Sequence, residues 1–97
     1  DLVVIEFTDF QCYYCSSSQA VKKKLLKKFP EIKWVFKHFP LTEIHDEAFL
    51  AHIGSECFLQ TNPEKFWDYY YTLFENYKNL SVSKLLDYAR NSGGDLD

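Results

Sequence analysis

Hydrophobic and polar residues follow one another along the chain with two different periods. Residues 2–7 (Leu-Val-Val-Ile-Glu-Phe) are β-branched and nearly all apolar, which predicts a strand buried on both faces of a parallel or mixed sheet. Residues 32–39 are β-branched and aromatic and predict a second strand, which Pro40 closes. A helical period covers residues 12–28 and ends at Pro30. This order predicts a βαβ unit with a right-handed crossover.

The helix predicted over residues 12–28 is amphipathic. Its apolar face consists of Ala20, Val21, Leu25 and Phe29. Five lysines crowd the other side, and we expect them to form a basic, solvated face: Lys22, Lys23, Lys24, Lys27 and Lys28. They gather toward the C-terminal half of the helix, where the helix dipole favours cations.

From residue 42 onward the pattern is helical. The first helix of this part runs to about residue 60, with Thr42 or Asp46 as its cap. Asn62-Pro63-Glu64 starts a second helix, because Pro is favoured at the first helical position and an acid in the first turn. Its apolar stripe is Phe66, Tyr70, Leu73, Phe74 and Tyr77.

A third helix follows after Ser81, which we expect to be its N-cap. Gly93 ends this helix, and residues 93–97 have the composition of a linker or of a cut end. The chain begins with Asp1 rather than Met, so we expect it to be a processed or trimmed chain.

Composition narrows the class of protein. The 97 residues are at most one domain's worth of chain, and 46% hydrophobic with 26% charged residues is an ordinary globular balance. The net charge of −3 removes the electrostatic reason to expect a nucleic-acid partner. No apolar run approaches the roughly 20 residues of a membrane span. Cysteine stands out, because three thiols cannot all be paired within one chain.

Cys12 and Cys15 form a Cys-x-x-Cys motif at the start of the first predicted helix, just after the first predicted strand. A thiol at a helix N-terminus faces unpaired N–H groups and the positive end of the dipole, which stabilises thiolate relative to thiol. Cys12 is therefore the candidate nucleophile. Cys15 lies one turn deeper on the same face and is the candidate resolving thiol.

Two other interpretations of the motif stay open from the residues alone. In the first, Cys12 and Cys15 are half of a zinc site, for which the remaining candidate ligands are Cys57, His38, His45 and His52. In the second, the pair is a static disulfide. Either would make the chain a non-catalytic binding module. The strand-to-helix context favours redox chemistry over a zinc site, so we predict no metal.

Longer segments resemble a known family. Residues 4–15 (Val-Ile-Glu-Phe-Thr-Asp-Phe-Gln-Cys-Tyr-Tyr-Cys) resemble the active-site strand and turn of the DsbA-like thiol–disulfide oxidoreductases of the thioredoxin superfamily. Residues 35–41 resemble that family's second strand and following turn, and residues 65–68 (Lys-Phe-Trp-Asp) its Lys-Phe-Trp signature. Its Ala-rich helix is matched by His45, Ala48, Ala51 and Cys57. The resemblance covers nearly the whole chain.

The resemblance implies an α/β, thioredoxin-like fold with an inserted helical domain. Residues 1–40 would be the N-terminal βαβ part that carries the Cys-x-x-Cys site, and residues 41–97 the helical insert. No proline lies where the family's cis-proline loop would follow the insert, so the C-terminal strands and helix of the fold are expected to be missing from this chain. A two-stranded sheet exposes a pairing edge and an apolar face, and we expect weakened substrate binding.

The resemblance also implies roles. Cys12 would be the attacking thiol, Cys15 its partner and Glu6 the buried acid near the pair, able to exchange a proton with Cys15. The alternative for Glu6 is a solvated place at a sheet edge. Tyr13 and Tyr14 replace the Pro-His pair of strongly oxidising members, so they would tune the redox pair, form an apolar lip for a peptide, or pack against the core.

The implied activity is exchange of disulfides with protein or peptide substrates, chiefly disulfide-bond formation, without a cofactor. A redox partner protein would regenerate the pair, and the implied location is extracytoplasmic, in a bacterial periplasm or cell envelope.

The remaining candidate residues have ordinary interpretations. We expect Cys57 to be buried in the insert as a small hydrophobe. The aromatic run over residues 66–71 should pack the insert, and His38, His45 and His52 should be structural or surface residues.

Overall fold

The computed structural model describes residues 2–41 and 43–94. In chain order the elements are β1 (Val3–Thr8), α1 (Tyr13–Lys28), β2 (Lys33–His38), α2 (Ala48–Thr61), the short 3₁₀ helix η1 (Pro63–Lys65), α3 (Phe66–Glu75) and α4 (Val82–Asn91). Thr42, one of the two expected caps, and residues 95–97 of the expected linker lie outside the described residues.

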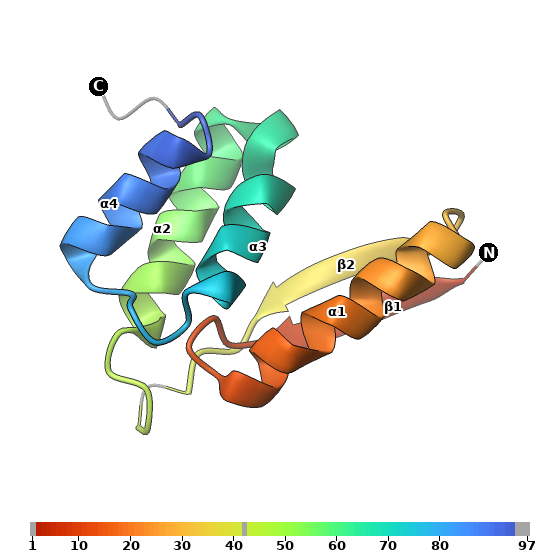
Figure 1. Cartoon of the computed structure of the whole chain (residues 1–97), viewed down its shortest axis with the longest axis horizontal. Helices are drawn as coiled ribbons and strands as arrows, with labels where there is room; N and C mark the ends of the chain where they lie inside the picture. The colour runs from red at the N-terminus through yellow and green to blue at the C-terminus, as the bar shows by residue number, and fades with distance from the viewer. Residues whose placement is uncertain (1, 42, 95–97) are drawn as a thin grey trace.

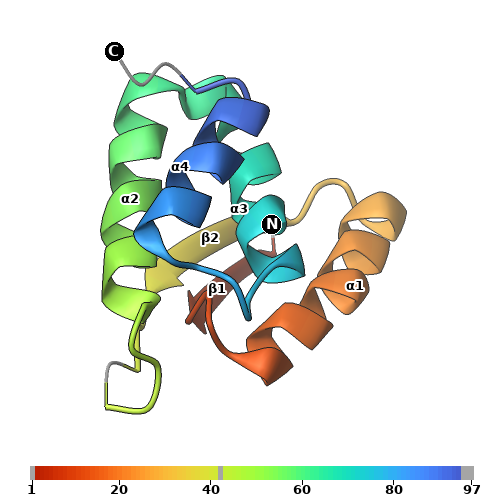
Figure 2. The ribbon, with the colours of Figure 1, turned by 60° about the vertical axis from the view of Figure 1, so that its left-hand side comes forward.

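The predicted βαβ unit is confirmed. β1 and β2 pair in parallel, with Val3 opposite Lys33 and Thr8 opposite His38. The connecting helix α1 runs alongside the two strands (Figure 1). The carboxyl end of β2 points toward the three remaining helices, and the turn that leads from β1 into α1 lies at this same end of the sheet (Figures 1 and 2).

The helices α2, α3 and α4 pack against one another, and α3 also contacts α1. Pro63 starts a helical segment as predicted, first as η1 and then as α3. Ser81 caps α4, since its Oγ accepts a hydrogen bond from the Lys84 N–H, and Gly93 follows the helix with a φ of 87°. The prediction of Asp46 as an alternative cap of α2 is wrong, because Glu47 holds the N-cap position, without a side-chain hydrogen bond.

The core is largely aromatic and joins the sheet to the bundle. Phe10, fully buried just after β1, packs against Phe36 of β2 and against Tyr70 and Phe74 of α3, with ring centroids 4.9–5.7 Å apart. The run over residues 66–71 supplies this core as predicted. Tyr69 takes part in it, whereas Tyr77 lies beyond the end of α3 and is half-buried.

The prediction that residues 2–7 are buried on both faces is wrong. Val3, Ile5 and Phe7 are 49%, 56% and 65% exposed, whereas Glu6 and Thr8 point inward. Side chains alternate between the faces of a strand, and α1 and α3 supply contacts only to the inward set. The apolar face expected of a two-stranded sheet is therefore present.

The predicted apolar face of α1 is wrong, and of the five lysines expected to be solvated, Lys22 is buried. Lys22 is 2% exposed, while Val21 and Leu25 are 59% and 39% exposed. The helix presents Gln19 and Lys22, three residues apart, to the sheet and to α3, because the acid of β1 and the aromatic rings of α3 accept their polar ends.

Candidate active site

The turn between β1 and α1 places the two cysteines of the motif. Cys12 is the N-cap residue of α1, and Cys15 lies in the first turn of the helix. The Cys12 N–H donates to the Asp9 carbonyl oxygen at 3.1 Å, and the Cys12 carbonyl oxygen accepts from the Ser16 N–H at 2.9 Å. Both thiols are half-buried and free. The structure thus gives the helix-terminal placement of Cys12 that the sequence predicted.

Asp9 holds this turn in place and was missed by the sequence analysis. Its buried carboxyl group accepts hydrogen bonds from the Gln11 and Leu41 N–H groups at 2.8 and 2.9 Å. His45 Nδ1 lies 2.7 Å from the same carboxyl group. The carboxyl group therefore ties the cysteine turn to the segment that enters the helical bundle. The available signal in the sequence was a charged residue, Asp9, next to the aromatic residue Phe10 at the end of the predicted strand.

Cys15 has a mixed environment. Burial raises the pKa of its thiol, the nearby Thr8 side chain and Asp9 backbone lower this pKa, and the neighbouring Cys12 thiol raises it; the net direction is upward. Cys15 also packs against the buried aromatic core.

Tyr13 and Tyr14 lie on the surface rather than in the core. They are 57% and 79% exposed, and their rings meet edge to face at 5.2 Å. The Tyr13 ring also packs 5.9 Å from that of Tyr77, which follows α3. Of the interpretations left open, packing against the core is wrong. The rings instead form an aromatic surface beside the thiols.

Glu6 lies in a polar pocket beneath α1, with its side chain 12% exposed. It accepts hydrogen bonds from the Tyr70 hydroxyl, from Gln19 Nε2 at 3.2 Å and from Trp34 Nε1 at 3.3 Å. The alternative of a solvated sheet edge is therefore wrong. Gln19 Nε2 also donates to the Cys15 carbonyl oxygen at 2.9 Å, so Gln19 connects the Glu6 carboxyl group to the backbone of Cys15.

Lys22 is the cation of this pocket. Its Nζ lies 4.0 Å from Glu6 Oε1 and 4.1 Å from the ring centroids of both Trp67 and Tyr70. It has no hydrogen-bond partner in the described part of the chain. Burial lowers the pKa of Lys22 to about 8, although Glu6 acts in the opposite direction. Aromatic faces and the acid thus take the place of water around the ammonium group.

His52 connects α2 to the sheet. Its Nε2 accepts a hydrogen bond from the Phe10 N–H at 3.1 Å, so in the neutral ring the proton is on Nδ1, which lies 2.7 Å from His38 Nδ1. His38 Nε2 in turn lies 2.8 Å from Glu56. Burial, followed by the influence of His38, lowers the pKa of His52 to about 4. This chain of bonds gives the histidines structural positions.

The zinc interpretation finds no ligand cluster in the residues that the structure describes. Within 2–41 and 43–94, no three His, Cys, Asp or Glu side chains are gathered so as to hold a metal ion. In the same ranges, no helix is long and apolar enough to cross a membrane.

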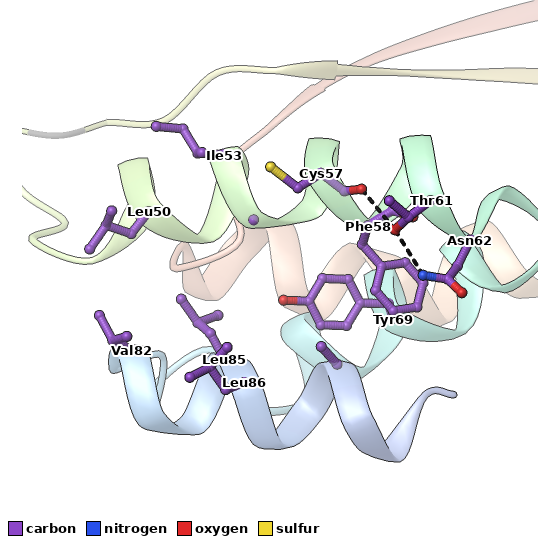
Figure 3. Close-up of a pocket in the computed structure, with 12 residues that line it drawn as sticks. Leu50, Ile53, Cys57, Phe58, Thr61, Asn62, Tyr69, Val82, Leu85 and Leu86 are labelled. Atoms are coloured by element: carbon purple, nitrogen blue, oxygen red, sulfur yellow. Dashed lines mark hydrogen bonds between the residues drawn. The ribbon is translucent and has the colours of Figure 1, made fainter. Parts of the chain in front are cut away.

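The prediction that Cys57 is buried is wrong. It is exposed, and its thiol lines an apolar groove of about 530 Å³ between α2 and α4, with Leu50, Ile53 and Leu86 along the walls (Figure 3). The Tyr69 ring forms the floor, and burial, followed by the nearby Cys57, raises the pKa of Tyr69 to about 12. The apolar residues of α4 approach this side of α2 without covering it.

With this geometry established, the fold can be compared with known proteins. A family model described as thioredoxin matches residues 1–97. The thiol–disulfide exchange protein α-DsbA2 from Wolbachia pipientis superimposes with a TM-score of 0.90 and 22% identity, over 100% of this chain and 50% of its own. Oxidised BdbD from Bacillus subtilis gives a TM-score of 0.82 and 26% identity, over 93% and 52%.

The chain belongs to the thioredoxin family that this model describes, and its fold is that of DsbA-like thiol–disulfide exchange proteins. The predicted fold class is confirmed, and the chain spans about half the length of these solved structures.

Curated proteins give a second kind of match. The Na(+)/H(+) antiporter NhaA 1 of Salinispora arenicola is 32% identical over 96 residues, which are 99% of this chain and 14% of the antiporter. NhaA 3 of Salinispora tropica is 30% identical over the same shares. This chain is therefore similar to one segment of these much longer proteins.

Proposed function

We propose that this chain is the catalytic part of a thiol–disulfide oxidoreductase that promotes disulfide-bond formation in protein or peptide substrates. The observation that carries the proposal is the placement of Cys12 at the N-cap of α1, with Cys15 in the first turn of the helix and packed against the buried core. The thioredoxin family match and the DsbA-like fold support oxidoreductase chemistry of this general kind.

In the proposed reaction the oxidised pair receives electrons from a substrate dithiol. A substrate thiolate attacks Cys12 Sγ, the Cys12–Cys15 bond breaks, and its electron pair leaves on Cys15 Sγ. The second substrate thiolate then attacks the substrate sulfur of the mixed disulfide and releases Cys12 as a thiolate. The substrate leaves with a new disulfide, and the enzyme is left with two reduced cysteines.

We propose supporting roles for three further residues. Glu6 sits 12% exposed behind the pair and tunes it through Gln19, which binds both the Glu6 carboxyl group and the Cys15 backbone. Tyr13 and Tyr14 offer exposed rings beside the thiols, suited to an apolar stretch of substrate.

The proposal extends to the setting of the protein. A redox partner protein reoxidises the pair after each turnover, and an extracytoplasmic location in a bacterial periplasm or envelope keeps it oxidised. We also propose that residues 1–40 and 41–97 are the catalytic part and the helical insert of the domain. Peptide binding is expected to be weaker for this chain than for a protein of the relatives' full length.

Trapping of a mixed disulfide tests the proposal. Oxidised glutathione is the probe, because it needs no extended peptide-binding surface. We expect Cys15→Ser to accumulate a glutathione adduct on Cys12, since no resolving thiol remains, and the wild-type chain to pass through this adduct to an internal disulfide. Mass spectrometry after acid quenching measures both species.

The matched control is Cys57→Ser, which should behave like wild type because Cys57 lies in the α2–α4 groove. Equal adduct formation by Cys12→Ser and Cys15→Ser would contradict the proposal, as would one tightly bound zinc ion per chain in the purified protein.

A further inference from the structure

The inward face of β1 carries a polar side chain that the proposed chemistry has not used. Thr8 is the last residue of the strand and is 2% exposed. Its backbone is occupied, since the Thr8 carbonyl oxygen accepts from the Phe39 N–H at 2.9 Å. Its hydroxyl oxygen has no partner with regular hydrogen-bond geometry in the described part of the chain. An unpartnered buried hydroxyl is costly, and one beside a reactive group needs an explanation.

The neighbour of this hydroxyl is Cys15. Strand alternation puts Thr8 on the same face as Glu6, toward α1. Cys15, in the first turn of α1, packs against the buried core on this side of the sheet. The Thr8 side chain and the Asp9 backbone both favour the ionised form of its thiol. A neutral thiol is a weak acceptor, whereas a thiolate accepts strongly. The hydroxyl thus has no regular partner beside the neutral thiol, and a thiolate at Cys15 would offer it a strong acceptor.

We propose that Thr8 is a positioning residue for exchange, whose hydroxyl donates a hydrogen bond to the Cys15 sulfur when that sulfur leaves as a thiolate. This inference rests on the proposed function and adds a residue to it. The broken Cys12–Cys15 bond leaves its electron pair on Cys15, and the hydroxyl stabilises this charge without giving up its proton. Burial disfavours ionisation of Cys15, and a hydrogen bond from the Thr8 hydroxyl would offset part of this cost.

The test compares three variants, each of which changes a single threonine side chain. Thr8→Val keeps the shape and removes the hydroxyl, Thr8→Ser keeps the hydroxyl, and Thr72→Val makes the same exchange in α3, where the hydroxyl bonds only the Asp68 carbonyl oxygen. Circular dichroism of each variant establishes that it is folded.

The first measurement isolates the acidity of Cys15 without any turnover. Each variant is made in a Cys12→Ser, Cys57→Ser background, and the rate of Cys15 alkylation by iodoacetamide is followed against pH. We expect Thr8→Val to move the midpoint to higher pH, while Thr8→Ser and Thr72→Val stay with the parent. An unmoved midpoint in Thr8→Val, or the same rise in Thr8→Ser, would overturn the inference.

The second measurement uses the intact cysteine pair. Reduction of the Cys12–Cys15 disulfide by glutathione should be roughly fivefold slower in Thr8→Val, the effect of losing one hydrogen bond to a charged leaving group. Equal rates in Thr8→Val and wild type would also overturn it. If the wild-type chain forms no exchangeable disulfide, the proposed function fails, and the alkylation midpoints still decide whether Thr8 acts on Cys15.

Discussion

Lys22 illustrates how one residue can leave its expected environment. Four other lysines of α1 are exposed, but Lys22 is 2% exposed and lies over the rings of Trp34, Trp67, Tyr70 and Tyr71. Its pKa of about 8 reflects the loss of water around the ammonium group. The aliphatic stem fills space between α1 and α3, and the charge faces Glu6.

This position predicts unequal effects of two substitutions in one helix. Lys22→Ala should lower the free energy of unfolding by about 2 kcal/mol or more, because it opens a cavity among aromatic rings and removes the cation next to Glu6. Lys24→Ala, at an exposed position, should change it by less than about 0.5 kcal/mol. Urea unfolding followed by fluorescence measures both. Similar small changes in both variants would show that Lys22 is solvated.

At this scale the sequence predicted the cysteine pair and the buried acid but not their surroundings. Cys12, Cys15 and Glu6 were identifiable because their types and their places relative to one strand and one helix carry the information. The donors around Glu6 come from α1, β2 and α3. Such contacts between distant segments leave no local signature. The alternation of β1 could have placed Thr8 on the Glu6 face.

Among the elements, α2 is the one whose docking depends on a titratable side chain. His52 of α2 accepts the Phe10 N–H next to the cysteine turn, and its ring packs 4.6 Å from that of Phe10. Protonation of Nε2 would break this bond and place a charge in the core. Because burial disfavours that charge, the pKa of His52 is lowered to about 4. His38 and Asp9 are the other titratable groups beside the ring.

The sign of the pH dependence follows. Between pH 6.5 and about 4 the unfolded chain binds a proton at His52 that the folded chain does not, so the free energy of unfolding falls as the pH falls. From pH 7 to pH 5 this one group should remove about 2 kcal/mol. The contribution of neutral His52 to the free energy of unfolding is fully present only above pH 6.5, where the unfolded chain no longer binds this proton.

His52→Gln keeps an acceptor for the Phe10 N–H and cannot titrate. We expect it to be less stable than wild type at pH 7, through lost ring packing, but to lose less stability between pH 7 and pH 5. Carboxyl groups titrate in both proteins and cancel in the comparison. Urea titrations at the two pH values measure the difference, and parallel losses would contradict the assignment to His52.

Element types were predictable because each carries its own period and stop signal, such as Pro30, Pro40 and Pro63. Which face an element buries was not. The strand pattern of residues 2–7 indicates an interior strand, yet β1 has one open face because the helices cover only the side that carries Glu6 and Thr8. The apolar side of α1 is likewise exposed, since α3 takes the Gln19–Lys22 side.

The described part of the chain is a βαβ unit joined to a helical bundle by an aromatic core, with the turn between β1 and α1 at the junction (Figures 1 and 2). Cys12 and Cys15 lie where this turn enters α1. Asp9 and His52 fasten that junction from the two sides. The chain spans about half the length of the solved structures it resembles, and one face of its sheet is exposed. The pair and the groups around it, however, all lie within the described residues.

The central claim is that Cys12 and Cys15 form one exchangeable two-electron pair. Equilibration of the 97-residue chain against a series of reduced and oxidised glutathione ratios, with alkylation and mass mapping of each cysteine, tests it most directly. We predict that Cys12 and Cys15 become protected together in a single two-electron transition, as an internal disulfide, while Cys57 stays outside that pair. Separate glutathione adducts on Cys12 and Cys15 at every ratio, with no internal disulfide, would contradict the account.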